Sequence, residues 1–243
     1  MHYKAYILSI FFALVAFSSP LNYVSAASFS ADLHSSQMGS EHSDADSRPV
    51  AKKILVIGDS MTGWLAERMA AYGKSNDFEV ATVIWDGSTI NKWANNSTKI
   101  TGYINQTKPD AVFICLGLNE LAEKNPQTRY GAAIDKIKNA CGNIPIIWVG
   151  PPTWPGKQWG EPLNGWLESK MGSTHYFNSL PLKLSRQSGT NPHPSRDGIS
   201  RWVDAIIDWL PANGAIRLPS YNHPTTPHIR PATYIYRKMS QPL

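Results

Sequence analysis

From residue 52 onward, short apolar runs alternate with stretches whose apolar residues recur at helical spacing. The apolar runs predict buried strands at 54–57, 80–85, 111–116 and 144–149, with a weaker strand at 175–178. The helical stretches fall at 61–72, 98–106, 126–140, 165–171 and 199–210. Strands that alternate with helices predict a three-layer α/β/α domain around a mainly parallel, five-stranded sheet.

The segments that precede this pattern differ from it. A basic start and an apolar run at 5–17 lead to small residues that end at Ala26. The run is too short for a comfortable membrane span, so we expect a signal peptide over 1–26, with an uncleaved anchor as the alternative. The protein is then periplasmic or secreted, with no stable membrane insertion after cleavage. Residues 27–50 are rich in Ser, Asp and His, which predicts a flexible linker.

The strand and helix pattern ends near Pro211, so we place the domain at 51–212 and a Pro-rich tail at 213–243. The tail carries several aromatic and basic residues. It could pack on the surface, bind a partner or be disordered, and the sequence does not choose among these alternatives.

Composition narrows the class of protein. Hydrophobic residues make up 42% of the 243 residues and charged residues 17%, which excludes a wholly disordered chain. The net charge of +5 is modest and its basic residues are scattered, so we expect no nucleic-acid partner. The two cysteines, Cys115 and Cys141, could form a disulfide or remain buried thiols, and neither has the spacing of a metal site.

Candidate chemistry lies where the predicted strands end, because ligands bind at that edge of an open parallel sheet. Ser60 follows the first strand in Gly58-Asp59-Ser60 and leads into a helix. It could cap that helix, or it could be a nucleophile beside the positive end of the helix dipole. Gly87 follows the second strand, Asn119 the third, and His193 precedes the last helix.

These residue types suit acyl transfer. A serine hydroxyl needs a general base, and a neutral histidine such as His193 has a suitable pKa. The Ser60 N–H, the Gly87 N–H and the Asn119 amide would form the oxyanion hole. Taken singly, Gly87, Asn119 and His193 could be ordinary turn, loop and surface residues, but their joint placement favours an active site.

The chain resembles the SGNH (GDSL-type) serine hydrolase family over roughly 53–210. The matching positions are Gly58-Asp59-Ser60, Gly87, Gly117-x-Asn119, and His193-Pro194 with Gly198. The resemblance implies a flavodoxin-like fold and the hydrolysis of ester bonds. This chemistry requires no cofactor and no metal. The third block reads Gly-x-Asn-Glu where the family usually has Gly-x-Asn-Asp, which leaves the asparagine in place.

One position departs from the family pattern. Family members commonly carry an aspartate three residues before the histidine, and here that position is Thr190. The nearest acid in the sequence is Asp197, four residues after His193. We expect a Ser60–His193 dyad whose histidine is oriented by a backbone carbonyl of the 190–192 loop. An acid from another loop, or weakened catalysis, remains the alternative.

The substrate is suggested by the loop at 151–166, in which Trp154 and Trp159 could stack on sugar rings. Core or lid packing is the alternative explanation for such tryptophans. No long apolar insertion points to a lipid substrate. We therefore expect an acylated carbohydrate, from the cell envelope or a plant polysaccharide, and removal of its O-acetyl groups. A lysophospholipase, a short-chain carboxylesterase and a non-catalytic carbohydrate-binding or assembly protein are the alternatives, and the oligomeric state is open.

Overall fold

The computed structural model describes residues 46–243. The predicted signal peptide and most of the predicted linker lie outside the described residues. The centre of the fold is a six-stranded sheet in the order β5-β4-β3-β1-β2-β6, in which every pairing is parallel. The strands are β1 (Lys53–Gly58), β2 (Glu79–Trp85), β3 (Ala111–Cys115), β4 (Ile146–Val149), β5 (Tyr176–Phe177) and β6 (Thr233–Arg237).

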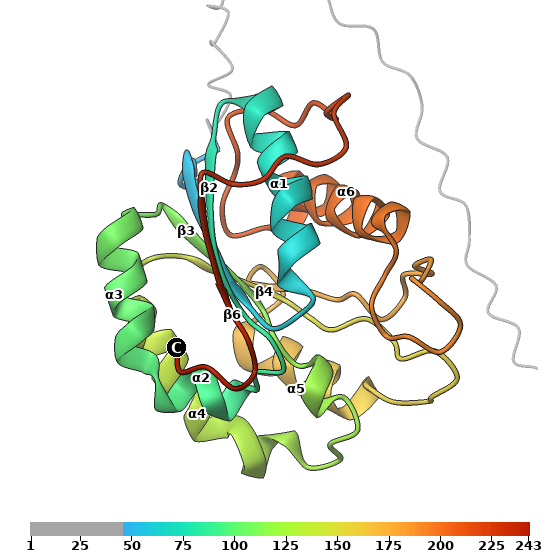
Figure 1. Cartoon of the computed structure of the whole chain (residues 1–243). Helices are drawn as coiled ribbons and strands as arrows, with labels where there is room; N and C mark the ends of the chain where they lie inside the picture. The colour runs from blue at the N-terminus through green and yellow to red at the C-terminus, as the bar shows by residue number, and fades with distance from the viewer. Residues whose placement is uncertain (1–45) are drawn as a thin grey trace, which may run out of the picture. The chain divides into compact units, whose positions relative to one another are not determined.

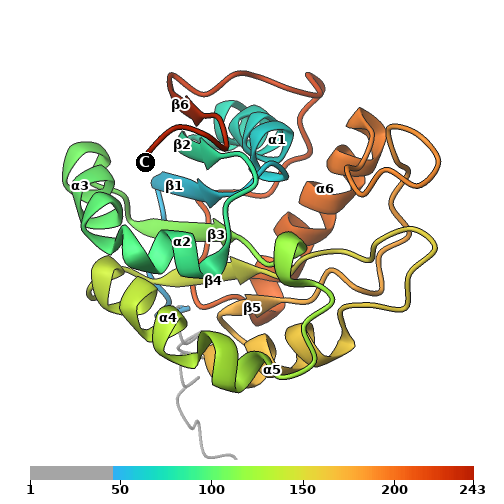
Figure 2. The same cartoon turned by 60° about the horizontal axis from the view of Figure 1, so that its bottom comes forward.

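Helices cover both faces of the sheet, as Figures 1 and 2 show. One face carries α1 (Thr62–Asn76) and α6 (Arg196–Asn213). The other face carries α2 (Ile90–Asn95), α3 (Ser97–Thr107), α4 (Pro126–Cys141) and α5 (Glu161–Met171). A short 3-10 helix, η1 (Leu118–Glu120), follows β3. The predicted α/β/α fold is confirmed, although the sequence analysis did not predict α2.

The hydrophobic core lies on both sides of the sheet because the central strands are apolar along most of their length. In β1, Ile54 and Val56 pack toward α1 and α6, whereas Leu55 and Ile57 pack toward the other four helices. None of these four side chains is more than 1% exposed. A strand buried on both faces reads as a continuous apolar run, which is why 54–57 was recognisable in the sequence.

The two cysteines are free thiols, so the structure decides between the alternatives left open above. Cys115 belongs to the core cluster beneath α1 and α6, whereas Cys141 belongs to the cluster on the opposite face. The sheet lies between the two clusters, and both cysteines act as small apolar side chains.

The strand count differs from the prediction because the tail supplies β6. This strand pairs with β2 in the register Thr82↔Tyr234 and Ile84↔Tyr236, and it forms the edge of the sheet (Figure 2). The tail therefore packs on the domain and extends its sheet. After β6 the chain turns toward α2 (Figure 1), and Leu243 is buried in the core cluster on that face.

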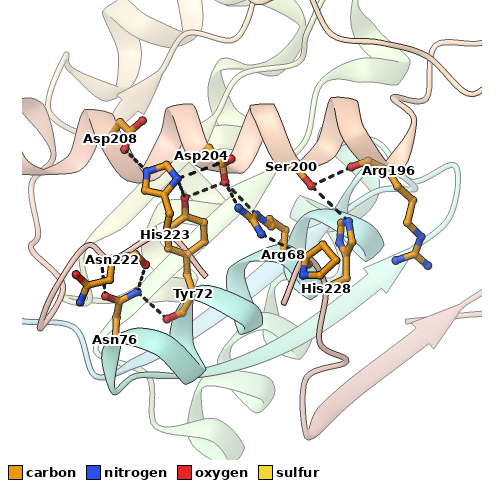
Figure 3. Close-up of polar contacts among 11 residues, drawn as sticks. Arg68, Tyr72, Asn76, Arg196, Ser200, Asp204, Asp208, Asn222, His223 and His228 are labelled. Atoms are coloured by element: carbon orange, nitrogen blue, oxygen red, sulfur yellow. Dashed lines mark hydrogen bonds and ion pairs between the residues drawn. The ribbon is translucent and has the colours of Figure 1, made fainter. Parts of the chain in front are cut away.

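Polar contacts hold the start of the tail against α1 and α6 (Figure 3). The guanidinium of Arg68 donates to Asp204 Oδ1 at 2.7 and 2.9 Å and to the carbonyl of Pro227 at 3.2 Å. Tyr72 Oη lies 2.8 Å from the same carboxylate oxygen and 3.0 Å from Nδ1 of His223. We refer to Arg68, Tyr72, Asp204 and His223 as the tail-anchoring cluster.

No helix within residues 46–243 is both long and apolar enough to cross a membrane.

Candidate active site

A tight turn after β1 presents Ser60. A Cβ on Gly58 would lie 2.1 Å from the carbonyl oxygen of Cys115, so only glycine fits beside β3 at this point. The turn is closed by the Met61 N–H, which donates to Asp59 Oδ1 at 2.9 Å. Helix α1 begins at Thr62, and its N-cap residue is Met61, without a side-chain cap. Ser60 is therefore not the helix cap that the sequence allowed.

The Ser60 hydroxyl is engaged by a histidine from the loop that precedes α6. Ser60 Oγ lies 2.9 Å from His193 Nε2. On the other side of the imidazole ring, His193 Nδ1 lies 2.9 Å from Asn191 Oδ1. Serine, histidine and asparagine thus form a continuous hydrogen-bonded chain, and both sequence-predicted members, Ser60 and His193, meet in it.

The tautomer of His193 follows from its partners. Asn191 Oδ1 also accepts the His193 backbone N–H at 2.9 Å, which identifies this atom as the amide oxygen rather than the nitrogen. An oxygen can only accept, so Nδ1 of His193 carries the proton. Nε2 is then free to accept the Ser60 hydroxyl proton, as a general base must.

The loop that holds His193 is braced by its own backbone and by Arg186. The Gln187 N–H donates to the His193 carbonyl at 3.1 Å, and Ser195 N–H donates to the Ser185 carbonyl at 2.9 Å. The guanidinium of Arg186 donates to the carbonyls of Pro192 and Thr153, the second at 2.7 Å. These bonds fix the imidazole relative to the loop after β4.

Burial lowers the pKa of His193 below its usual value of 6.5. The negative Asp86 opposes this effect and the positive Arg186 adds to it. A lowered pKa keeps the imidazole neutral, and therefore basic, at and somewhat below neutral pH.

The structure corrects the two orienting residues considered from the sequence. Asp197 lies on the exposed surface, where its Oδ2 lies 3.2 Å from Ser185 Oγ and 3.3 Å from Arg201 Nε. Thr190 is exposed in the turn before Asn191. The expected backbone carbonyl is not the partner of Nδ1 either. Asn191 was missed because it is not an acid and lies two residues before the histidine, not three.

Two of the three oxyanion candidates, Gly87 and Asn119, lie on the loops after β2 and β3, the strands that flank β1. Asn119 Nδ2 donates to the Ser88 carbonyl at 2.7 Å, and the Ile90 N–H donates to Glu120 Oε1 at 2.7 Å. These two bonds join the loop of Gly87 to that of Asn119 and leave the second Asn119 N–H uncommitted. Within residues 46–243, the backbone N–H groups of Ser60 and Gly87 donate no hydrogen bond, so both are available to an oxyanion.

Two buried carboxyl groups lie beneath this edge. Burial raises the pKa of Asp59 to about 8 and that of Glu120 to about 7. Among residues 46–243, Asp59 Oδ2 and Glu120 Oε2 find no hydrogen-bond partner. Both groups are therefore protonated more readily than ordinary carboxyls. Within residues 46–243, no set of three His, Cys, Asp or Glu side chains is placed to hold a metal ion.

A cavity of about 170 Å³ opens beside the serine. Ser60 and His193 both line it. Its remaining polar or aromatic lining residues are Trp64, Asp86, Gln187, Tyr234 and Tyr236. The two tyrosines belong to β6, so sequence analysis could not place them while the tail had no assigned structure.

Trp154 and Trp159 do not line this cavity. Their rings contact each other edge to face, with centroids 5.9 Å apart. Trp154 packs against the core beneath α1 and α6, and Trp159 is 38% exposed and lines a separate pocket. The tryptophan beside Ser60 is instead Trp64, from the first turn of α1.

No protein-family model and no curated protein matches the chain. Three solved structures resemble it at low identity. A G-D-S-L family protein from Desulfitobacterium hafniense DCB-2, described as lipolytic, is 18% identical with a TM-score of 0.46, and the match covers 64% of this chain and 97% of that one. A family 3 carbohydrate esterase from Clostridium thermocellum is 20% identical with a TM-score of 0.46, and the match covers 66% of this chain and 97% of that one. TesA is 18% identical with a TM-score of 0.45, and the match covers 65% of this chain and 97% of that one. The α/β/α fold itself is established by the strand order and helix layers of this chain.

Proposed function

We propose that the protein is an exported serine esterase of the SGNH type that removes O-acetyl groups from a carbohydrate. The observation that carries the chemistry is the chain of contacts from Ser60 Oγ to His193 Nε2 and from His193 Nδ1 to Asn191 Oδ1. A serine paired with an oriented neutral imidazole is the arrangement that activates a hydroxyl for attack on a carbonyl carbon.

In the first half of the reaction, Ser60 Oγ attacks the acetyl carbonyl carbon while His193 Nε2 takes the hydroxyl proton. The carbonyl π electrons move to the oxygen, and we expect the N–H groups of Ser60, Gly87 and Asn119 to bind it. When the tetrahedral intermediate collapses, the C–O bond to the alcohol breaks and His193 gives its proton to the leaving oxygen. Acetyl-Ser60 and a free sugar hydroxyl result.

Water then repeats the sequence on the acyl-enzyme. His193 takes a proton from water, the resulting hydroxide attacks the acetyl carbon, and the proton passes to Ser60 Oγ as acetic acid leaves and ionises to acetate in solution. Asn191 acts in both halves by holding the Nδ1 proton in place, so that Nε2 always faces the reacting oxygen. Its contribution is orientation, because a neutral amide oxygen adds less charge stabilisation than a carboxylate.

Two further features support the substrate assignment. The cavity beside Ser60 is lined by Asp86, Gln187 and two tyrosines rather than by a long apolar channel, which suits a hydroxylated substrate better than a lipid. The segment at 1–26, which lies outside the described residues, has the sequence features of a signal peptide and supports action on an extracellular or envelope polysaccharide.

Hydrolysis of 4-nitrophenyl acetate by wild type and by Ser60→Ala and His193→Ala tests the chemistry. We expect each variant to lose about a thousandfold or more in kcat, since the pair acts as a unit. Ser169→Ala, an exposed serine on α5, is the matched control and should keep full activity. An inactive wild type, or an unchanged Ser60→Ala, would contradict the proposal.

The same proteins then identify the substrate. Acetate release from acetylated xylan and from O-acetylated peptidoglycan, compared with hydrolysis of an octanoyl ester, separates carbohydrate deacetylation from general ester or lipid hydrolysis. A clear preference for the octanoyl ester would favour the lipid alternative instead.

A further inference from the structure

We propose that the cavity beside Ser60 binds the alcohol half of the ester, as a single uncharged, hydroxylated ring selected by Asp86, Tyr234 and Gln187. This inference rests on the proposed function, because only an ester hydrolase has a leaving alcohol to bind. It adds which part of the substrate enters the cavity, which residues select it, and what charge it carries.

The size of the cavity fits one ring. A protein cavity of about 150 Å³ is known to hold benzene, and this cavity measures about 170 Å³. Gln187 and Tyr236 at its margin are exposed, so ring substituents can reach solvent and a longer chain of sugars can continue outward. An acetyl group alone would leave most of this volume empty.

The polar groups of the cavity are uncommitted. Within residues 46–243, neither the Tyr234 hydroxyl nor the Gln187 side-chain amide forms a hydrogen bond, and Asp86 Oδ1 accepts none. Asp86 Oδ2 accepts from the Tyr236 hydroxyl, which fixes the orientation of the carboxylate. A carboxylate, a phenol and an amide together offer both donors and acceptors. That combination suits hydroxyl groups and does not suit the methyl group of an acetyl ester.

Charge selects against an anionic alcohol. Within residues 46–243, Asp86 forms no ion pair, so it brings a negative charge to the lining of the cavity. The Arg230 guanidinium lies 4.1 Å from the Tyr234 ring centroid, but Arg230 does not line the cavity. Arg196 lies nearby, with its guanidinium 4.6 Å from the Trp64 ring centroid, but it is paired with Glu67 at 2.9 Å. A phosphate or carboxylate on the leaving alcohol would therefore be repelled, whereas a hydroxyl can donate to Asp86.

Apolar walls complete the subsite. Tyr234 and Tyr236 are two residues apart on β6, so their rings lie on the same face of the sheet, which is also the face of Ile84. Gly63 in α1 leaves space for the first of them, because a Cβ there would lie 3.2 Å from Tyr234 Oη. Aromatic and aliphatic faces with a few fixed polar groups are the usual lining of a small-molecule site.

The proposal is tested with three acetate esters that differ in leaving-group charge. The neutral ester is a methyl glycoside that carries one O-acetyl group. The anionic ester is the corresponding methyl glycoside of a uronic acid, with its carboxylate free, and the cationic ester is acetylcholine. We expect wild type to prefer the neutral glycoside. In Asp86→Asn, the ratio of kcat/KM for the neutral ester to that for the uronate should fall about 10-fold, because the repulsion is removed.

Tyr234→Phe tests the hydroxyl. The ratio of kcat/KM for the glycoside acetate to that for 4-nitrophenyl acetate should fall about 5-fold, because the aryl ester has no hydroxyl to bond. The controls are Asp135→Asn on α4, a carboxylate paired with Lys170, and Tyr103→Phe on α3. Both lie outside the cavity and should leave all ratios unchanged.

A calorimetric titration gives an answer that is independent of turnover. The glycoside acetate should bind Ser60→Ala, and adding Asp86→Asn should weaken that binding several-fold. Unchanged ratios in both cavity variants, or a wild-type preference for the uronate or for acetylcholine, would overturn the subsite while leaving the esterase intact. If wild type hydrolyses no ester, the proposed function fails. Absence of binding to Ser60→Ala would then overturn the subsite as well.

Discussion

At the scale of single residues, the unusual position is the one that faces His193 Nδ1. Serine hydrolases commonly place a carboxylate there, which both fixes the tautomer and stabilises the imidazolium. Here Asn191 Oδ1 holds the tautomer through the same contact, and the backbone N–H of His193 prevents the amide from turning its nitrogen toward the ring. Orientation is retained, and charge stabilisation is reduced.

Changing Asn191 separates these two effects. Asn191→Asp should raise the pKa of His193, because a negative charge favours the imidazolium, and so move the acid limb of the kcat/KM profile to higher pH. In wild type that limb should lie below pH 6.5, since burial lowers the pKa of His193. Asn191→Ala should lower kcat by about 10- to 100-fold. A pH–rate profile of the three proteins checks this. An unshifted limb in Asn191→Asp would show that residue 191 does not act on the base.

Asp197 should matter little for the reaction. Its carboxylate contacts Ser185 and Arg201 on the surface, so Asp197→Asn should keep kcat within about twofold of wild type. His193→Ala should instead cost about as much as Ser60→Ala. Steady-state kinetics on 4-nitrophenyl acetate compares them, and a loss of several orders of magnitude in Asp197→Asn would refute the Asn191 assignment.

Much of the candidate site was accessible from sequence, for a physical reason. Ser60, Gly87 and Asn119 follow strands, and strand ends in a parallel sheet share an edge. Asn191 and Asp86 were not assigned roles, because their contacts depend on side-chain direction within loops. Trp154 and Trp159 were placed near the substrate on residue type alone, and their packing against each other shows the weakness of that argument.

At the scale of elements, the main error concerned β6. The segment Thr233–Arg237 alternates aromatic and aliphatic residues, which is a strand pattern. The strand pattern was concealed because prolines at 224, 227 and 231 precede the segment and no helix pattern lies beside it. Strands such as β3 and β4 were recognisable because burial on both faces makes them apolar throughout, whereas the edge strand β6 is only partly buried.

The tail-anchoring cluster should be important for the stability of this added strand. Asp204→Ala would leave the buried Arg68 guanidinium without its ion-pair partner, and we expect a loss of about 2 kcal/mol in the free energy of unfolding. Asp208→Ala is the control, since Asp208 is exposed and, within the described part of the chain, bonds to the cluster through His223 alone without contacting Arg68. Urea unfolding of both variants measures the difference, and equal effects would argue against the cluster.

At the scale of the whole molecule, buried carboxyl groups should make stability depend on pH. Burial raises the pKa of Asp59 from 3.8 to about 8 and that of Glu120 from 4.5 to about 7. Between those limits the folded state binds more protons than the unfolded state, so the free energy of unfolding should fall as pH rises through this window.

Urea unfolding at pH 5 and pH 8 measures that dependence. Wild type should be less stable at the higher pH, whereas the double variant Asp59→Asn/Glu120→Gln should show a smaller difference because neither side chain ionises. A wild-type stability that rises over this range would contradict the assigned direction of these pKa shifts.

The distance in sequence between β2 and β6 has a consequence for biogenesis. A chain that emerges N-terminus first, from a ribosome or a translocation pore, presents Ser60 and His193 before Tyr234 and Tyr236. The reactive pair can therefore assemble on a five-stranded intermediate whose leaving-group wall has not arrived. Such a species would be a nascent esterase that lacks the Tyr234 hydroxyl and the tyrosine wall of the cavity, and its alcohol subsite is completed only when the last strand docks.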